Sequence, residues 1–161
     1  MTKTEIIQRN VRFSQWVQSL ESLTDEEWLS PVKPGKWSIA EIITHLIYWD
    51  RYFLKERYPK IKAGARLPRS IDVHVMNQKA SLYAKSGVPK KKIIKEFIET
   101  RDLLTKAINA RSEEELDATF YDRGHPETLR KCLIKFCEHD RHHKHQIEDF
   151  LQKELKVEEM K

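Results

Sequence analysis

Residues 35–50 read GKWSIAEIITHLIYWD, and this stretch decides the fold because it has the features of a helix start. Ser38 and Glu41 have the spacing of a capping box, in which each side chain satisfies a free backbone N–H of the first turn. Apolar residues then recur at helical spacing: Ile39, Ile42, Leu46, Trp49 and Phe53. The stretch therefore predicts a helix that begins at Ser38, buries one face and ends at Pro59.

The same periodicity extends along the rest of the chain. It predicts three more long helices, over residues 4–22, 90–110 and 128–156, and a shorter helix over about 70–85. Prolines and glycines mark residues 25–36 and 111–127 as connectors, and no strand is predicted. We therefore expect an all-α four-helix bundle of antiparallel type, with one short additional helix between the second and third long helices. Residues 1–161 are expected to form a single domain, since no long linker divides them.

The composition agrees with long helices, because only 4 glycines and 6 prolines occur while 34% of the residues are charged. The net charge is +5, and the 30 basic residues are interleaved with 25 acidic ones. Only the pI near 9.1 points to nucleic acid. No known reader motif occurs, and the aromatic residues fit a buried core better than a stacking surface. We therefore expect no nucleic-acid partner.

Features of the chain also bear on its compartment. The first residues, MTKTEIIQRN, contain no apolar stretch of the kind that a secretory signal needs. No apolar run approaches the roughly 20 residues that span a bilayer, so no membrane partner is expected. Cys132 and Cys137 are five residues apart on one predicted helix, where their side chains diverge. A reduced cytoplasmic location is the simplest interpretation.

Histidines are concentrated on two of the predicted helices. His139 and His143 are four residues apart, so they share a helix face, and that face lies toward the apolar stripe. His45 lies one turn from Ile42 and one turn from Trp49, beside the buried stripe of its own helix. His142 and His145 point away from the core. Three imidazoles directed inward need hydrogen bonds or a ligand, because a buried histidine loses its hydration.

A pair of histidines four residues apart offers two nitrogens to one metal ion, and a third histidine from a facing helix completes a tripod. Such a tripod leaves a coordination position open, which is the pattern of catalytic zinc sites. The spacing alone also occurs in surface histidines that bind nothing. His45, His139 and His143 are accordingly the candidate metal ligands.

Two stretches of the sequence resemble the DinB/YfiT-like family. Residues 35–50 resemble its second-helix signature, matched at Trp37, Ser38, Glu41, His45 and Leu46. Residues 139–151, HDRHHKHQIEDFL, resemble its last-helix signature, matched at His139, His143, Gln146 and Ile147. The length and the helix order fit as well, so the resemblance covers nearly the whole chain.

The resemblance implies a four-helix bundle with a three-histidine site for a divalent transition metal, zinc or nickel, and His45, His139 and His143 would be the ligands. It also implies a homodimer. Members of the family include bacillithiol- and mycothiol-linked thiol transferases and proteins described as metal-dependent hydrolases, and many have no assigned reaction.

Asp140 and Cys132 are further candidates with open alternatives. Asp140 stands where the H-E-x-x-H motif of zinc proteases has its basic glutamate. It could act as a general base, orient a ligand histidine, or pair with a buried arginine. Cys132 lies two turns before His139 on nearly the same face, as a soft metal ligand or as a small packed core residue.

The sequence therefore favours a metal-dependent enzyme that activates a low-molecular-weight thiol for transfer to an electrophile. A metal-dependent hydrolase that activates water, and a metal-binding stress-response module without catalysis, are the alternatives.

Overall fold

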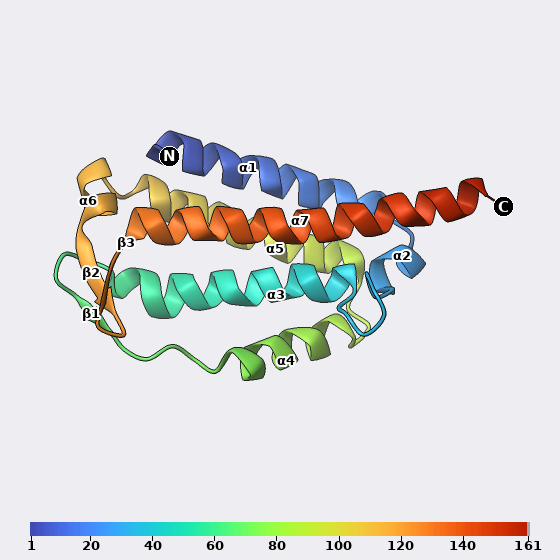
Figure 1. Ribbon diagram of the computed structural model, residues 1–161, viewed down its shortest axis with the longest axis horizontal. Helices are drawn as coiled ribbons and strands as arrows, with labels where there is room; N and C mark the ends of the chain where they lie inside the picture. The colour runs from blue at the N-terminus through green and yellow to red at the C-terminus, as the bar shows by residue number, and fades with distance from the viewer. Residues whose placement is uncertain (161) are drawn as a thin grey trace.

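The computed structural model describes residues 1–160. Four long helices run side by side along the molecule, and a shorter helix lies along the outside (Figure 1). The long helices are α1 (Lys3–Ser19), α3 (Ile39–Tyr52), α5 (Lys90–Asn109) and α7 (Leu129–Glu159), and the shorter one is α4 (Val73–Ala84). The predicted four-helix bundle with one additional helix is confirmed.

The directions of the helices differ from a purely antiparallel bundle. α1 and α7 run one way along the molecule, whereas α3 and α5 run the other way (Figure 1). The reason is α4, which carries the chain back along α3 before α5 begins. α1 packs against α5 and α7, and α5 packs against α3, but the backbones of α3 and α7 do not pack closely. Side chains lie between α3 and α7, and they surround the cavity described below.

The predicted capping box at the start of α3 is present. The Glu41 backbone N–H donates to the Ser38 hydroxyl, and the Ser38 N–H donates to the Glu41 carboxylate, both at 3.2 Å. The other Glu41 oxygen accepts from the Ser81 hydroxyl at 2.5 Å, which joins α4 to α3. Residues 39–47 are all buried, because α4 covers the face of α3 that the apolar periodicity predicted to be exposed to solvent. α3 is therefore the central helix of the molecule.

The two predicted connectors contain structure that the sequence analysis missed. Each holds a five-residue helix, α2 (Asp25–Leu29) and α6 (Glu113–Asp117). Capping boxes open both of them, from Thr24 to Glu27 and from Ser112 to Glu115. The same S/T-x-x-E pattern that identified α3 was thus available at both places.

A small three-stranded sheet closes one end of the bundle, contrary to the prediction that the chain contains no strand. It consists of β1 (Arg66–Leu67), β2 (Thr119–Asp122) and β3 (His125–Thr128). β2 pairs in parallel with β1 and antiparallel with β3. Arg123 and Gly124 form the two-residue turn between β2 and β3, and both have positive φ, 54° and 77°. Two such residues are the requirement of a type I′ hairpin turn.

The end of α3 is irregular in a way that matters for the site. The α-helix continues into a π-helix, η2 (Phe53–Arg57), and then a 3-10 turn, η3 (Tyr58–Lys60). The predicted end near Pro59 is therefore confirmed for the helical stretch as a whole. Single π-helical turns are frequent beside functional sites, and Phe53 and Arg57 both line the cavity between α3 and α7.

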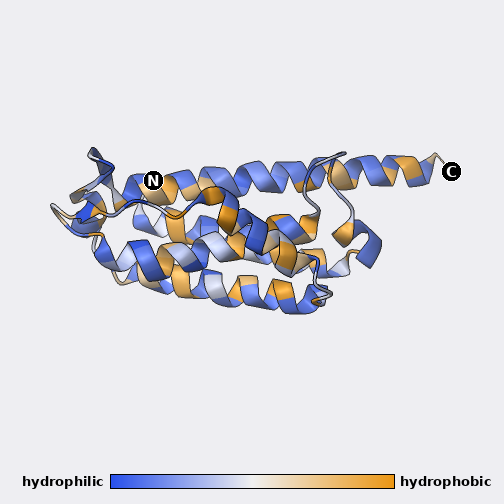
Figure 2. Ribbon diagram, turned by 90° about the horizontal axis from the view of Figure 1, so that it is seen from below, coloured by the Kyte–Doolittle hydropathy of each residue, from blue (hydrophilic) through white to orange (hydrophobic). Residues whose placement is uncertain are grey.

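Two clusters of buried apolar side chains hold the bundle together. One lies among the four long helices, and the other lies at the sheet end and includes Phe120 of β2 and Leu129 of α7. Figure 2 shows hydrophobic and hydrophilic residues alternating along the helices, as expected of helices that bury one face. Among residues 1–160, no helix combines the length and apolar character that a membrane crossing requires.

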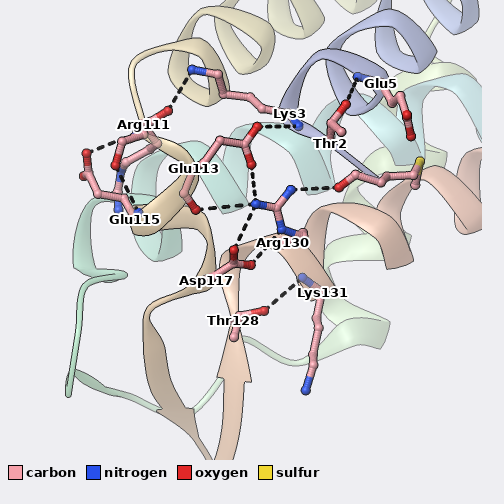
Figure 3. Close-up of polar contacts among 12 residues, drawn as sticks. Thr2, Lys3, Glu5, Arg111, Glu113, Glu115, Asp117, Thr128, Arg130 and Lys131 are labelled. Carbon is pink, nitrogen blue, oxygen red and sulfur yellow. Dashed lines mark hydrogen bonds and ion pairs between the residues drawn. The ribbon is translucent and has the colours of Figure 1, made fainter.

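Arg130 fixes the first turn of α7 to the rest of the sheet end (Figure 3). Its guanidinium donates to Asp117 at 2.7 Å, to the carboxylate of Glu113 and to the backbone carbonyl of Met1 at 2.7 Å. Glu113 also accepts from the backbone N–H of Lys3 at 3.1 Å. These hydrogen bonds join α6, the start of α1 and the start of α7, so they set the position of the helix that carries His139 and His143.

Candidate metal centre

Three histidine side chains converge between α3 and α7. His45 comes from α3, while His139 and His143 lie one turn apart on α7, and one ring nitrogen of each lies within 4.8 Å of the others. The Nε2 atoms of His139 and His143 are 3.1 Å apart. His45 and His143 are buried, whereas His139 is exposed. The three residues singled out in the sequence are thus brought together, with one ring facing open space.

The ring nitrogen that His45 offers is fixed by its neighbours. Asn77 of α4 places its side-chain oxygen 3.0 Å from Trp49 Nε1 and 2.8 Å from His45 Nδ1. An indole N–H can only donate, so the Asn77 atom must be the oxygen rather than the amide nitrogen. The His45 Nδ1 therefore carries the hydrogen, and its Nε2 keeps a free lone pair. Trp37 packs against the same ring, with centroids 4.8 Å apart.

Gln146 orients His143 in a similar way. Its side-chain oxygen lies 2.8 Å from His143 Nδ1. A donor at Nδ1 leaves Nε2 as the acceptor, and Nε2 is the atom that faces His139. Hydrogen bonds of this kind to the distal nitrogen are typical of histidines that bind metals, because they fix the tautomer and the ring plane. Asn77 and the role of Gln146 are features that the sequence analysis did not predict.

This donor set fits a divalent transition metal. Zinc–nitrogen bonds of about 2.0–2.1 Å in tetrahedral geometry place two ligand nitrogens roughly 3.4 Å apart. The distance of 3.1 Å between the Nε2 atoms of His139 and His143 is close to that value. Imidazole nitrogens suit zinc, nickel, copper and iron rather than magnesium or calcium. Three protein ligands would leave a coordination position for water or substrate.

Loss of water around the rings favours the uncharged form of the three histidines. Desolvation lowers the pKa of His45 to about 4 and that of His143 to about 4, and it also lowers the pKa of His139. Neighbouring histidines lower the pKa of each ring further, because adjacent positive charges repel. Only a neutral imidazole has the lone pair that a metal needs. The site is therefore ready to bind a cation without first releasing protons.

The lowered pKa values predict how the stability of the metal-free protein depends on pH. Below pH 6.5 the histidines of the unfolded chain take up protons, while His45 and His143 in the folded chain resist protonation down to about pH 4. The unfolding free energy should therefore fall as the pH drops from 6.5 to 4, by up to about 3 kcal/mol for each ring. Urea unfolding at pH 7, 5.5 and 4.5 measures this slope, and His45→Gln should make it shallower.

A second prediction concerns Asn77, which supports His45 without belonging to the triad. Asn77→Leu removes the acceptor for the Nδ1 hydrogen of His45, so the ring loses its fixed tautomer. Loss of such an outer partner should weaken zinc binding about 10–100-fold. Competition with a chromophoric chelator measures the affinity. Gln78→Leu, an exposed change at the next position of α4, is the matched control and should leave the affinity unchanged.

A cavity of about 1020 Å³ extends from the histidines toward the small sheet. Aromatic side chains, including Trp49, Phe53 and Phe136, form much of its wall. His125, Lys135 and Glu127 lie along the wall nearer the sheet. A small organic molecule with an apolar body fits a cavity of this size and lining. His125 is exposed at the rim of the cavity, whereas His74 is exposed and lies outside the cavity lining.

Asp140 adopts the third of the roles that the sequence left open, pairing with a buried arginine. Its two oxygens accept from Nη1 and Nη2 of Arg101 at 2.6 and 2.7 Å. The Nε of Arg101 donates to Asp50 at 2.6 Å, and all three side chains are buried. Both oxygens of Asp140 are therefore occupied by a guanidinium, which favours structural pairing over service as a general base. Burial raises the pKa of Asp50 to about 6, and Arg101 opposes that rise.

Cys132 lies in the cavity wall and is not part of the histidine cluster. Its Sγ lies 4.0 Å from a carboxylate oxygen of Glu127. Burial and that nearby negative charge raise the pKa of Cys132 to about 11, so the thiol stays protonated at neutral pH. A packed wall residue is the interpretation that these surroundings support, rather than a thiolate ligand.

The protein is thus a helical bundle with a histidine triad at the end of a large cavity. The sequence profile of the DinB superfamily matches residues 11–147. The chain belongs to the DinB superfamily, which confirms the resemblance found in the sequence.

Solved structures with the same fold come from several sources. YfiT from Bacillus subtilis, described as a probable metal-dependent hydrolase with an unusual four-helix bundle topology, is 18% identical, with a TM-score of 0.73 over 94% of this chain and 86% of YfiT. The colibactin self-resistance protein ClbS, crystallised with double-stranded DNA, is 18% identical, with a TM-score of 0.73 over 93% and 95%. A DinB-like protein from Bacillus cereus is 17% identical, with a TM-score of 0.65 over 94% and 92%. A search of curated proteins found no match.

The expectation that nucleic acid is excluded as a partner is wrong, because ClbS, which shares this fold, was crystallised with double-stranded DNA. The physical reason lies in how the fold gathers charge. Arg9 and Arg12 of α1 and Arg141 and Lys144 of α7 line a groove of about 330 Å³. These cations are far apart in the sequence, where acidic residues separate them. Binding to phosphates also needs no reader motif.

The identity of the metal, the thiol substrate, the cytoplasmic location and the homodimer remain predictions. So does the assignment of His45, His139 and His143 as the ligands, for which the geometry gives support.

Proposed function

We propose that this protein is a metal-dependent enzyme that transfers a low-molecular-weight thiol to an electrophile, with His45, His139 and His143 as ligands of zinc or nickel. The observation that carries the proposal is the arrangement of the three rings. Hydrogen bonds to Nδ1 of His45 and His143 leave their Nε2 lone pairs free. The third ring, His139, faces open space where a substrate can approach.

A divalent metal at this site would favour the thiolate form of a bound thiol, which is the nucleophilic form. The chain supplies the other requirements. The aromatic wall of the cavity excludes water around the sulfur and its target. The thiolate attacks carbon, a carbon–sulfur bond forms, the bond to the leaving group breaks, and the thiol proton is released to solvent. Positioning both reactants in one cavity converts an encounter in solution into a local reaction.

The test uses the purified protein with its metal content measured on the same sample. Protein loaded with zinc or nickel should consume bacillithiol together with monobromobimane and form the conjugate faster than free metal does. Protein stripped with a chelator should lose this activity and regain it when metal is restored. Equal rates for the loaded and the stripped protein would count against the proposal.

Hydrolysis is the second reaction that the same site supports. YfiT carries the description of a probable metal-dependent hydrolase, and an open position on three histidines suits activation of water as well as of thiol. A panel of amides and esters assayed on the same loaded sample distinguishes the two reactions. A metal-binding module without catalysis would show bound metal and a thermal shift on chelation, with no turnover in either assay.

The basic groove favours a second function, the binding of duplex DNA through its phosphates. Arg9, Arg12, Arg141 and Lys144 line it together with Asp140 and Glu148, so cations are in excess there. None of the four cations forms an ion pair with a carboxylate within residues 1–160. Like charges three residues apart on a helix repel each other, so the excess of cations in the groove costs stability. Phosphates placed in the groove would remove that repulsion and release condensed counterions from the DNA.

Fluorescence anisotropy with a labelled 20-base-pair duplex tests this function. Arg12→Ala/Arg141→Ala should weaken binding, and the slope of log affinity against log salt should fall by about 2, because each of the two cations would neutralise one phosphate. Lys95→Ala/Lys106→Ala removes the same charge from α5 as a control and should change neither quantity. An unchanged slope for the groove variant would exclude the groove as the DNA-binding surface.

A further inference from the structure

Asp50, Arg101 and Asp140 form a network near the histidine triad, and the two aspartates lie on the helices that carry the histidines. Asp140 directly follows His139 on α7 and precedes His143 by three residues. Asp50 lies on α3, five residues beyond His45. Arg101 joins the two carboxylates from α5, a helix that supplies no histidine. The helices that carry the candidate ligands are therefore connected to each other through one buried guanidinium.

The surroundings of Arg101 fix its position closely. Besides its bonds to the two carboxylates, its Nη1 donates to Asn10 Oδ1 of α1 at 3.2 Å. The rings of Phe13 and Phe97 flank the guanidinium, with its central carbon 5.2 and 5.0 Å from their centroids. All four long helices thus contribute to holding one cation that is only 2% exposed. Such complete burial is rare for an arginine and requires full pairing.

The charges of the network do not cancel. Two carboxylates surround one guanidinium, so an excess of one negative charge remains in the protein interior. A buried charge without a counterpart is costly, because it has lost the solvation by water. The three imidazoles nearby are uncharged. Asp50, Arg101 and Asp140 line the same cavity as the three imidazoles, so the excess negative charge lies beside the triad.

We infer that the Asp50–Arg101–Asp140 network is the electrostatic counterpart of the cation on the triad. Its excess negative charge stabilises a divalent metal held by three neutral histidines, and the bound metal in turn compensates the buried charge. Asp50 therefore acts as a positioning and charge-balancing residue that never touches the metal. This inference rests on the proposed function, since it requires a cation at the triad.

A series of variants in which the network charge changes stepwise tests the inference. The wild type carries an excess charge of −1, Asp50→Asn carries none, and Asp50→Asn/Asp140→Asn carries +1. The dissociation constant for zinc, measured by competition with a chromophoric chelator, should rise at least tenfold at each step, the range expected for groups that act on a metal from outside its ligand sphere. Asp102→Asn, the same change at the exposed neighbour of Arg101, should leave it unchanged.

Thermal unfolding of the metal-free proteins separates this role from a purely structural one. Asp50→Asn should unfold at the same temperature as the wild type or at a higher one, because the amide relieves an uncompensated buried charge. A lower unfolding temperature with an unchanged zinc affinity would overturn the inference and leave the network as a structural element. Asp50→Asn alone decides this point, even if the double variant does not fold.

The two proposals can fail separately. The wild type could bind zinc and His143→Ala could lose that binding, while the dissociation constant for zinc stays the same across the charge series. This result would overturn the charge inference alone. A wild type that binds no zinc, or that binds it equally well after His143→Ala, would overturn the metal-dependent function and with it this inference.

Discussion

His143→Ala should weaken zinc binding by more than a hundredfold and reduce thiol transfer to the background rate. His143 is buried, its Nδ1 is held by Gln146, and its Nε2 faces His139 at 3.1 Å. Loss of an outer hydrogen-bond partner already costs about 10–100-fold in metal affinity, so loss of a direct ligand should exceed that range. Two histidines on separate helices would remain, so water would have to supply the metal's other ligands. Chelator competition and the bimane assay measure the two effects on the same preparation.

The matched control is His145→Ala, which makes the same change at an exposed position two residues along α7. It should retain the affinity and the rate of the wild type. Circular dichroism of both variants without metal should show the same helix content, because His143 contributes to the site rather than to the apolar core. Wild-type affinity in His143→Ala would contradict the assignment of the ligands.

Arg101→Leu should lower the unfolding free energy of the metal-free protein by about 3–5 kcal/mol, the cost of leaving a buried charge without its partner. Here the effect concerns two carboxylates at once, Asp50 and Asp140, each within 2.6 Å of the guanidinium. No other single substitution in the network should reduce stability as much. Urea unfolding at pH 7 in the presence of a chelator measures it.

Arg51→Leu is the control for Arg101→Leu, because Arg51 is an exposed arginine of α3. It should change the unfolding free energy by less than about 0.5 kcal/mol. Asp50→Asn/Arg101→Leu/Asp140→Asn should recover much of the stability lost in Arg101→Leu, because no charge then stays buried. A small effect of Arg101→Leu would show that water or local rearrangement solvates the two carboxylates.

The sequence predicted the long helices and the inward-facing histidines because both depend on local patterns, whereas the meeting of His45 with His139 and His143 followed from the resemblance to the DinB/YfiT-like family. Apolar periodicity and the Ser38–Glu41 box define where a helix begins and which side faces inward. The i, i+4 spacing of His139 and His143 likewise follows from helix geometry alone. Even the burial of Asp140 next to an arginine was among the alternatives, although the sequence could not select Arg101 from so many basic residues.

The features that escaped prediction depend on interactions between distant segments. β1 is two residues long, and it forms only because β2, more than 50 residues later, lies beside it. Asn77 supports His45 from a helix 32 residues away, and nothing in its own neighbourhood marks it. Similarly, the basic groove combines residues of the first and last helices, which no local window contains. The small helices α2 and α6 are the exception, since their capping boxes were visible in the sequence.

The separation of His45 from the other two histidines along the chain has a consequence for biosynthesis. His45 leaves the ribosome more than 90 residues before His139, so the nascent chain carries one of the three candidate ligands without the other two over that stretch of synthesis. Arg9 and Arg12 of α1 likewise lack the basic residues of α7 beside them until α7 has docked. We therefore expect that α7 has been synthesised and has docked before any ion is captured. Translation order would thus delay metallation until the four long helices have assembled.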